Sequence, residues 1–505
     1  MNWELYTAGF RLLDVNVISF MVLGVVLGLV VGSLPGLTAT MGVSILVPLT
    51  YGLSMTASIM MLLGVYCSAN YAGSISATLV NIPGTPSAVM TTLDAYPMAL
   101  KGEAGRAIGI ATLSSSLGGL FSVVTLALFS PLIASIALKF NSFEMFLVAF
   151  WGISIMAYVS PGSTLKGLLA GFVGLIIATI GYDPVTAAPR FTFGESNLLS
   201  GVDFIAAMIG LFGVSEILLN IEKPGQNVRQ EIFKIEGSLR SFKEVIKMWA
   251  VVLRSSVAGV IVGAIPGAGG TIGSIVSYAQ QKRFSKHPEL MGTGSPEGIT
   301  AAEAANNACT GGAMTTLLSL GIPGDTVTAI LIGAFILHGI QPGPFLFQKN
   351  FDLVSAIFIG MVFINILFLI FGMFGARYLA RLLFIPRSIL NTVILALSVV
   401  GTYAVQASMF DVMVMLVFSG LGYVMTKQEI PRAPMVLALI LGPILEQNFR
   451  RWLSLADGQY VATLLDTYTH NPVSIVLSLL VVATMFFPLI RRNGKATPEK
   501  GNDQP

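Results

Sequence analysis

Two short Pro-Gly segments carry residue types that suit the binding of a small anion. Residues 32–42 read GSLPGLTATMG and residues 263–273 read GAIPGAGGTIG, so Gly, Pro, Gly, Thr and Gly recur at the same offsets. We call these segments box one and box two. Each is followed, roughly fifty residues later, by a second interruption: break one is 81–86 (NIPGTP) and break two is 321–326 (GIPGDT). Paired interruptions in two halves of a hydrophobic chain indicate the binding site of a transporter.

A Pro-Gly interruption exposes backbone groups that can bind a ligand. Proline removes an N–H group and disrupts the helix before it, while glycine permits backbone geometries that other residues avoid. The half-helix that begins after the interruption presents N–H groups and a positive dipole end, which can receive an anion. Neutral hydroxyl and amide side chains nearby add donors and acceptors. The combination suits a carboxylate, whose oxygens only accept hydrogen bonds, and broken-helix carbonyls can hold a coupling cation.

We therefore predict a substrate-binding site near the middle of the membrane, between the four interruptions. Its predicted residues are Pro35, Gly36, Thr38, Thr40, Asn81, Pro83, Gly84, Thr85, Pro266, Gly267, Gly269, Gly270, Thr271, Asn306, Asn307, Pro323, Gly324, Asp325 and Thr326. For any single Gly or Pro the alternative is helix packing, because small residues let helix backbones approach closely in membranes. For the four paired interruptions together we favour a binding site.

Two acidic residues lie close to these interruptions. Asp325 belongs to break two, and an ionisable group in an apolar region is a functional candidate. It can take up a proton or bind a cation; the alternative is that it caps the helix that follows. Glu303 is placed similarly, and its alternative is a carboxylate at the end of a loop.

The elements that hold these residues are hydrophobic enough to lie in a membrane. The 505 residues are 54% hydrophobic and 10% charged, with a mean hydropathy of +0.81, whereas soluble domains carry about 25% charged residues. The formal net charge of +3, without a compact basic run, does not favour nucleic-acid binding. Cys67 and Cys309 lie in apolar stretches, which excludes a disulfide framework and a cysteine-rich metal site.

The chain is predicted to be an all-α polytopic membrane protein with about 12 membrane segments, some of them broken or re-entrant hairpins. Both halves show the same order of span, box, apolar run, break and further spans, so we expect two homologous repeats. The repeats are inverted if each half crosses the membrane an odd number of times. The predicted division is 1–221 for the first repeat, 222–250 for a connector, 251–490 for the second repeat and 491–505 for a polar tail.

The polar segments indicate which side of the membrane they occupy. The connector is basic with interleaved apolar residues, so the positive-inside rule places it in the cytoplasm, in part as a helix on the membrane surface. The basic start of the tail places the C-terminus in the cytoplasm as well. We interpret residues 94–106 as a polar loop in which Asp94, Glu103 and Arg106 form ion pairs.

No pattern typical of an enzyme accompanies these features. Residues 267–273 resemble a dinucleotide-binding fingerprint, but the third glycine is one position late and the segment follows an apolar run rather than a strand. The sequence contains no Walker A motif and no His, Cys and carboxylate cluster with metalloenzyme spacing. We predict no catalytic residues, no metal site and no cofactor. An anion channel and a membrane-embedded enzyme are the alternatives to a carrier.

Several motifs in order make the chain similar to a known family. They are YAGSI at 71–75, NIPGTPSA at 81–88, DAYPMA at 94–99, PRFTFG at 189–194, RSS at 254–256, PGAG at 266–269, EAANN at 303–307, GIPG at 321–324 and QPGP at 341–344. Over nearly its whole length the chain resembles the large membrane subunit of the tripartite tricarboxylate transporters, the TctA type. Asp325 departs from the family pattern, which often has a small residue there.

The resemblance implies a secondary active transporter of the bacterial inner membrane. Its implied partners are a small membrane subunit of the TctB type and a periplasmic solute-binding protein of the TctC type. The implied substrates are tricarboxylates, dicarboxylates or aromatic acids, taken up by symport with Na⁺ or H⁺ through the lipid bilayer. The resemblance does not imply an enzyme.

Overall fold

The computed structural model describes residues 7–159, 163–184, 186–222, 241–383 and 385–491. Within these residues the regular structure is helical apart from β1 (Gly181–Tyr182) and β2 (Pro189–Arg190), which pair antiparallel. A helix satisfies its own backbone hydrogen bonds, which a chain must do inside a bilayer. The predicted all-α polytopic membrane fold is confirmed.

The chain divides into two compact units, and each unit takes segments from both halves of the sequence. Unit 1 consists of Met1–Lys139 and Thr192–Gln428, and unit 2 of Phe140–Phe191 and Glu429–Pro505. The predicted repeats follow the order of the chain instead, and their boundaries stay a prediction. Residues 223–240 of the predicted connector and 492–505 of the predicted tail lie outside the described residues.

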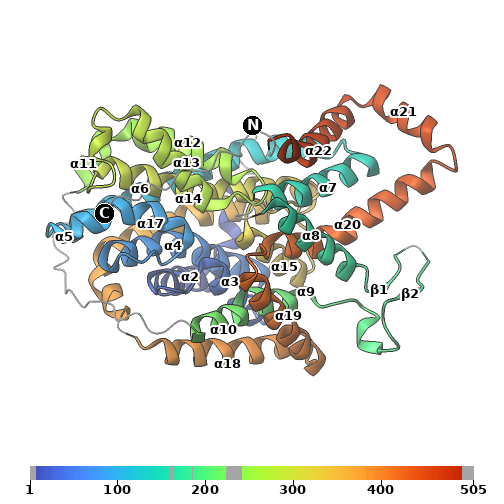
Figure 1. The fold of residues 1–505 in the computed structure, drawn as a ribbon, viewed down its shortest axis with the longest axis horizontal. Helices are drawn as coiled ribbons and strands as arrows, with labels where there is room; N and C mark the ends of the chain where they lie inside the picture. Colours follow the sequence, from blue (N-terminus) through green and yellow to red (C-terminus); the bar gives the residue numbers. More distant parts are fainter. Residues whose placement is uncertain (1–6, 160–162, 185, 223–240, 384, 492–505) are drawn as a thin grey trace, which may run out of the picture. The chain divides into compact units, whose positions relative to one another are not determined.

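Most of the helices belong to unit 1 (Figure 1). They are α2 (Val15–Ser33), α3 (Ala39–Leu46), α4 (Met55–Val80), α5 (Val89–Leu100), α6 (Ala104–Ala137), α9 (Phe204–Met208), α10 (Ser215–Glu222), α11 (Ser241–Lys247), α12 (Trp249–Gly263), α13 (Gly269–Phe284), α14 (Pro296–Leu320), α15 (Thr326–Leu337), α16 (Leu346–Lys349), α17 (Phe351–Leu382), α18 (Arg387–Gln406) and α19 (Met409–Lys427). Short 3₁₀ turns lie at Ala8–Leu12, Pro48–Thr50, Pro86–Ala88, Ser196–Leu198 and Pro288–Leu290, and a π-helical segment at Ile209–Val214.

Two long helices, α4 and α14, form the centre of unit 1. Almost every residue of both is buried, although both carry many serine, threonine and asparagine side chains. Each ends at a residue in the left-handed conformation, Asn81 with φ 56° and Gly321 with φ 73°, a common way to end a helix. Pro83 and Pro323 follow two residues later and cannot continue the helix. The two breaks therefore end the two central helices in the same way.

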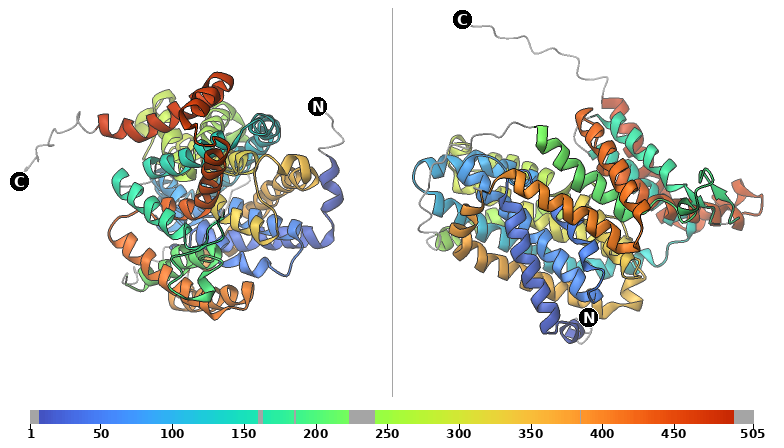
Figure 2. Two further views of the ribbon diagram at one scale, coloured as in Figure 1. Left: turned by 90° about the vertical axis from the view of Figure 1, so that its right-hand side faces the viewer. Right: turned by 90° about the horizontal axis from the view of Figure 1, so that it is seen from below.

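Glycines allow α2 to pack directly on the backbone of α4. A β-carbon on Gly28 would lie 2.6 Å from the carbonyl oxygen of Val65, and one on Gly32 would lie 2.2 Å from that of Ala69. No side chain fits at such a distance, so these positions require glycine. Figure 2 shows from two further sides how α2 and α4 run next to each other in the blue part of the ribbon.

The second half of the chain repeats this contact between α12 and α14. A β-carbon on Gly259 would lie 2.4 Å from the carbonyl oxygen of Ala305, and one on Gly263 would lie 2.3 Å from that of Cys309. The glycines and their partners are spaced as in the α2–α4 pair. The matching contacts support the predicted repeats, while their inversion and the number of crossings stay predictions.

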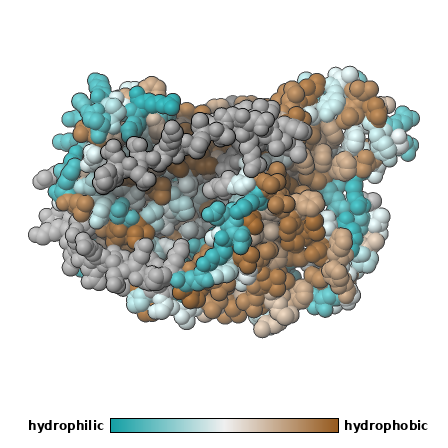
Figure 3. Space-filling model, in the orientation of Figure 1, coloured by the Kyte–Doolittle hydropathy of each residue, from teal (hydrophilic) through white to brown (hydrophobic). Residues whose placement is uncertain are grey.

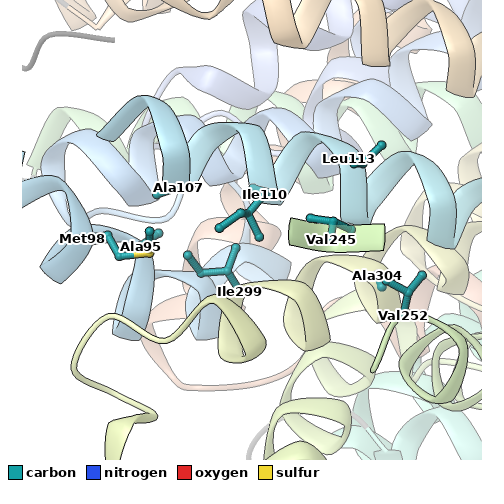
Figure 4. Close-up of a cluster of buried hydrophobic side chains, with 10 residues drawn as sticks. Ala95, Met98, Ala107, Ile110, Leu113, Val245, Val252, Ile299 and Ala304 are labelled. Atoms are coloured by element: carbon teal, nitrogen blue, oxygen red, sulfur yellow. The ribbon is translucent and has the colours of Figure 1, made fainter. Parts of the chain in front are cut away.

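A hydrophobic cluster joins five helices of unit 1 (Figure 4). Ile110 of α6 and Ile299 of α14 lie at its centre, flanked by Met98 of α5, Val245 of α11 and Val252 of α12. These side chains are buried, and their removal from water stabilises the packing of α6 on α14. The other long helix of the unit, α17, packs against α4 and α6.

Residues 94–106 do not form the predicted polar loop. Helix α5 continues through Asp94 and Pro97 to Leu100, and α6 begins at Ala104, so only three residues separate the two helices. Asp94 is buried, whereas Lys101 is exposed and Glu103 and Arg106 are half-buried. Of the predicted ion pairs, one exists, because Arg106 contacts Glu103 at 2.6 Å and also Glu244 at 2.5 Å.

Asp94 has neutral partners instead of a basic side chain. Its Oδ1 accepts hydrogen bonds from the backbone N–H groups of Gly292, Gly294 and Ser295 at 2.7–2.9 Å. Its Oδ2 accepts one from the Tyr278 hydroxyl at 2.8 Å. The carboxylate is fully buried and holds the turn that precedes α14 against α5.

Unit 2 is smaller and contains five helices and the two strands among its described residues. The helices are α7 (Ser142–Val159), α8 (Thr164–Ala178), α20 (Ala433–Leu455), α21 (Tyr460–His470) and α22 (Pro472–Arg491). Helix α20 packs against both α7 and α8. A cavity of about 660 Å³ lies between α8 and α20, lined by apolar side chains together with Thr179, Glu446, Arg450 and Ser454.

Four charged residues tie the β-ladder of unit 2 to α20. Arg190 contacts Glu446 at 2.6 Å and Asp183 at 3.4 Å, and Arg450 contacts Asp183 at 2.8 Å and Glu446 at 3.1 Å. Two cations and two anions thus balance each other. The hydrogen bonds that the Arg190 guanidinium donates to Glu446 raise the pKa of Arg190, and an arginine stays charged at physiological pH.

Six helical segments among the described residues are long and apolar enough to cross a membrane, or seven if α11 and α12, which are bent by 73°, count as one span. They are Val15–Ser33, Ala104–Ala137, Phe204–Glu222, Phe351–Leu382, Ser388–Gln406 and Met409–Lys427. The prediction of about 12 segments stays a prediction. Figure 3 shows broad hydrophobic areas on the surface, as expected of side chains that face lipid.

Candidate functional site

Box one meets break two through a pair of threonines. Thr40, in the first turn of α3, and Thr326, at the start of α15, lie with their hydroxyl oxygens 2.9 Å apart. Thr38 caps α3 by accepting a hydrogen bond from the Met41 N–H group at 3.1 Å. Segments separated by almost 300 residues in the sequence are thereby brought together, as the paired interruptions predict.

Box two also contacts break two, through its backbone. The Gly267 N–H group donates a hydrogen bond to the Gly324 carbonyl at 2.8 Å. A β-carbon on Gly324 would lie only 2.2 Å from the Gly263 carbonyl oxygen. Gly269 lies next to Asp325, whose Cβ would be 3.1 Å from a β-carbon at that glycine. Glycine is therefore required where these two segments pass each other.

Break one is packed in the corresponding way. A β-carbon on Gly84 would lie 2.0 Å from the Gly32 carbonyl oxygen. The Gly84 N–H group donates to the Gly73 carbonyl at 3.2 Å, so the break folds back on α4. Thr85 and Ser87 follow, both buried, with their hydroxyl oxygens 3.0 Å apart.

Asp325 is buried, and its carboxylate accepts hydrogen bonds from Thr328 and Tyr66. It caps α15 in a capping box, because Oδ1 accepts from the Thr328 N–H group at 2.8 Å and the Thr328 hydroxyl bonds the Asp325 N–H group at 2.9 Å. Its Oδ2 accepts a hydrogen bond from the Tyr66 hydroxyl. The capping role does not exclude a further function for Asp325, because its Oδ2 atom contacts Tyr66 of α4 at the centre of unit 1.

Asn306 and Asn307 connect the two central helices. Both are fully buried. Asn306 donates through Nδ2 to the Asn70 carbonyl at 3.1 Å, and Asn307 donates to the Cys67 carbonyl at 3.2 Å. Asn306 also faces box two, because a β-carbon on Gly270 would lie 2.6 Å from its Oδ1. The predicted asparagines therefore lie where α4, α14, box two and break one meet.

Some predicted residues lie away from this meeting point. The side chain of Asn81 is exposed at the end of α4. The carbonyl of Gly36 accepts a hydrogen bond from Asn220 of α10 at 3.4 Å. The remaining predicted residues, Pro35, Pro83, Pro266, Thr271 and Pro323, form the turns themselves or the first residues of the helices beside them.

The sequence analysis missed Tyr66, the partner of Asp325. A signal for it exists, because Tyr66 lies 19 residues before Thr85 in break one, as Asn306 lies 19 residues before Asp325 in break two. The central helix of each half thus carries a polar residue at the position that contacts the other half. Ser87, beside Gly270, and Thr328, in the capping box, were also missed.

Glu303 is not at the end of a loop. It lies within α14 and is fully buried, and its oxygens accept hydrogen bonds from Thr91 at 2.5 Å and Ser115 at 2.7 Å. It lies one turn before Asn306 on the same helix, and residues three apart share a helix face.

The four helix starts at the interruptions differ in their suitability for an anion. The start of α15 is already occupied by the Asp325 carboxylate and that of α3 by the Thr38 hydroxyl. No side-chain hydrogen bond caps α13, whose first residues are Gly269 and Gly270, and none caps the 3₁₀ turn and α5 that follow break one. The glycines bring the backbone close to Asp325, Asn306 and Ser87, and the positive end of the helix dipole there favours an anion.

Fold and site define a multi-pass helical membrane protein in which broken helices converge on two buried central helices. Comparison with known families gives a match over residues 18–437 to the model described as the tripartite tricarboxylate transporter TctA family. The chain belongs to this family, and so is a subunit of a tripartite tricarboxylate transporter.

Two curated relatives from Agrobacterium vitis are similar to the chain. One is named as an uncharacterised 52.8 kDa protein in the TAR-I ttuC' 3' region and is 35% identical over 468 residues, which is 93% of each chain. The other is named as an uncharacterised protein in the TAR-II ttuC' 3' region and is 35% identical over 236 residues, which is 46% of this chain and 96% of the relative. No solved structure matches the chain.

Proposed function

We propose that this chain is the carrier subunit of a secondary active importer of a tricarboxylate, dicarboxylate or aromatic acid, driven by a Na⁺ or H⁺ gradient. It works in the bacterial inner membrane, with its C-terminus in the cytoplasm. A TctC-type periplasmic protein delivers the solute, and a TctB-type small membrane subunit completes the complex. Membership of the family supports the carboxylate class and the tripartite assembly.

The observation that carries the proposal is the convergence of box two and the two breaks on α4 and α14. Gly267 bonds to Gly324, and Gly270 adjoins both Ser87 and Asn306. The uncapped start of α13 lies at this point. We place the substrate carboxylate at the backbone N–H groups of the first turn of α13, because an N–H group only donates hydrogen bonds and a carboxylate only accepts them.

Uptake of labelled carboxylates into cells that make this chain with both partner subunits tests the proposal. We expect saturable uptake of at least one member of the panel, dependent on a Na⁺ or H⁺ gradient and lost when the binding protein is omitted. Uptake that does not saturate and needs no gradient would favour an anion channel. Absence of carboxylate uptake by a fully assembled complex would contradict the substrate class.

Asp325→Asn tests whether the acidic residue of break two takes part in coupling. Asparagine caps helices about as well as aspartate, so the variant keeps α15 while removing the charge. We expect the pH or Na⁺ dependence of uptake to change, because an ionisable group buried in a membrane protein is kept for function. The matched variant Tyr66→Phe removes the hydroxyl that contacts the same carboxylate and should shift the dependence in the same direction. An unchanged profile in both variants would leave Asp325 with the capping role alone.

A further inference from the structure

Helix α11 carries an exposed face on which apolar and basic side chains lie next to each other. Phe242 and Ile246 are exposed, and so are Lys243 and Lys247. Residues four apart lie on the same face of a helix, so the apolar pair and the basic pair form two adjacent stripes. An apolar stripe beside lysines is typical of a helix that lies in the membrane interface.

The opposite face of α11 fixes the helix to unit 1. Val245 is fully buried in the cluster of Figure 4. Glu244 accepts two hydrogen bonds from the Arg106 guanidinium, at 2.5 and 3.0 Å. The Ser241 hydroxyl donates to the backbone carbonyl of Arg106 at 2.9 Å. Helix α6 therefore holds the two exposed stripes in one orientation.

The next helix shows where the exposed face of α11 lies in a bilayer. On α12, Leu253, Val257 and Ile261 recur every four residues and are exposed, as expected of a face in contact with lipid. Trp249, also exposed, lies at the start of this face, and tryptophan is enriched where hydrocarbon meets the headgroups. Helix α11 is bent from α12 by 73°. With α12 in the hydrocarbon, α11 therefore runs close to the plane of the headgroups.

A second group of cations lies where α13 ends beside α12. The guanidinium carbon of Arg254 in α12 lies over the Phe284 ring, 4.4 Å from its centre, so the first half of α12 meets the end of α13. Lys282 and Arg283 are exposed in the last turn of α13. Stacking on a ring uses the face of a guanidinium and leaves the N–H groups at its edge available to a phosphate.

The cations of this region have no acidic partner among the described residues. Glu103 and Glu244, which lie close to α11, both contact Arg106. No acidic side chain in the described part of the chain pairs with Lys243 or Lys247, nor with a basic residue of α12 or α13. The region therefore presents positive charge beside an apolar face, and such a combination attracts anionic lipids.

We propose that α11, the first half of α12 and the end of α13 form a binding surface for the headgroups of anionic phospholipids. Lys243, Lys247 and Arg254 contact the phosphates, while Phe242 and Ile246 enter the boundary of the acyl chains. A bilayer offers anions and hydrocarbon side by side, whereas a soluble anion matches the charge alone. The inference goes beyond the proposed function, because it concerns the surrounding lipid and not the transported solute.

The surface has a defined place relative to the interruptions. Box two joins the end of α12 to the start of α13, so it lies at the other end of the same helical hairpin. Lipid bound at α11 therefore anchors the element that carries box two.

The test measures lipid binding by the intact purified chain in detergent. A ligand that binds the folded state raises its unfolding temperature, so phosphatidylglycerol is compared with phosphatidylcholine at equal mole fractions in the micelle. We expect a saturable increase with phosphatidylglycerol alone, and a weaker one in about 1 M NaCl, because salt screens the attraction. The double variant Lys243→Gln with Lys247→Gln should raise the mole fraction for half-maximal effect at least about tenfold, since each basic residue near anionic lipid contributes roughly fivefold. In phosphatidylcholine it should unfold at the wild-type temperature.

The double variant Lys139→Gln with Lys349→Gln is the matched control. Both lysines are exposed; Lys139 lies beyond the last turn of α6 and Lys349 precedes α17. This variant should keep the wild-type response to phosphatidylglycerol.

Three results would overturn the proposal. The first is an equal response of the wild type to the two lipids, and the second is an unchanged response in the variant of α11. The third is an equal stabilisation by inorganic phosphate, which would show a site for any small anion. Loss of assembly with the small membrane subunit, in a variant of α11 that still responds to phosphatidylglycerol, would assign the surface to a protein partner and overturn the proposal as well.

Discussion

Gly324→Ala is expected to abolish uptake while the protein still inserts into the membrane. A single added methyl group would lie 2.2 Å from the Gly263 carbonyl oxygen and 2.6 Å from the Ala313 Cα. Both neighbours are backbone atoms of the α12–α14 pair, so neither can turn aside as a flexible side chain would. Break two must then move away from box two, and the hydrogen bond from Gly267 to Gly324 is lost.

The size of the effect follows from the geometry at each glycine. Gly84→Ala should be equally severe, because its β-carbon would lie 2.0 Å from the Gly32 carbonyl oxygen. Gly36→Ala should be milder: its nearest neighbour would be the Asn220 side chain at 3.4 Å, and the cost is mainly the positive φ of 94°, about 1–2 kcal/mol.

Uptake is measured together with the amount of each variant in the membrane. Gly420→Ala in α19 is the control, because a β-carbon there meets nothing within 4 Å. We expect it to match the wild type. Wild-type uptake by Gly324→Ala or Gly84→Ala would contradict the placement of the site at the breaks.

Asp94→Ala is expected to cause the largest loss of stability among single polar substitutions in unit 1. The change removes the acceptor of four donors: the buried Ser295 N–H group and Tyr278 hydroxyl, and the partly buried N–H groups of Gly292 and Gly294. A hydrogen bond to a charged group contributes about 1.5–3 kcal/mol, and unpaired buried donors add a desolvation cost. We expect the free energy of unfolding to fall by at least about 3 kcal/mol.

Thermal unfolding of the protein in detergent measures this effect. Tyr278→Phe removes one of the four hydrogen bonds and should cost about 1 kcal/mol. Glu289→Ala serves as the control, because this nearby acidic residue is 66% exposed and pairs only with His287 among the described residues. An Asp94→Ala protein that unfolds at the wild-type temperature would show that the turn before α14 does not depend on this carboxylate.

Much of the architecture can be predicted from hydrophobic runs and proline positions. The four interruptions lie between helices where they were expected. These features depend on local chemistry, since a proline next to a glycine disrupts a helix, whereas Pro97, Pro131 and Pro443 lie within helices. The family also follows from local motifs, and the match over residues 18–437 confirms it.

The rest depends on contacts between distant segments. The sequence alone shows Tyr66 as a tyrosine in an apolar helix. Its contact with Asp325 depends on where α15 lies in the folded protein. Asp94 reads as a loop residue because its neighbours are polar, although its partners lie about 200 residues away in the chain. Each unit also combines segments from both halves of the sequence, and this arrangement likewise depends on tertiary contacts. One of these contacts has a signal in the sequence, because Tyr66 and Asn306 lie the same number of residues before the matching positions of the two breaks.

The glycine contacts of α2 with α4 and of α12 with α14 have a consequence for how the protein moves. At Gly32 and Gly263 the backbones of each pair are in direct contact, so neither helix can rotate or slide past its partner without overlapping it. Each pair must therefore move as one rigid body. An opening toward either side of the membrane then has to occur at interfaces made by side chains, which can exchange rotamers. The threonine pair Thr40 and Thr326, held by one hydrogen bond between two rotatable hydroxyls, is such an interface and is where we expect the first separation.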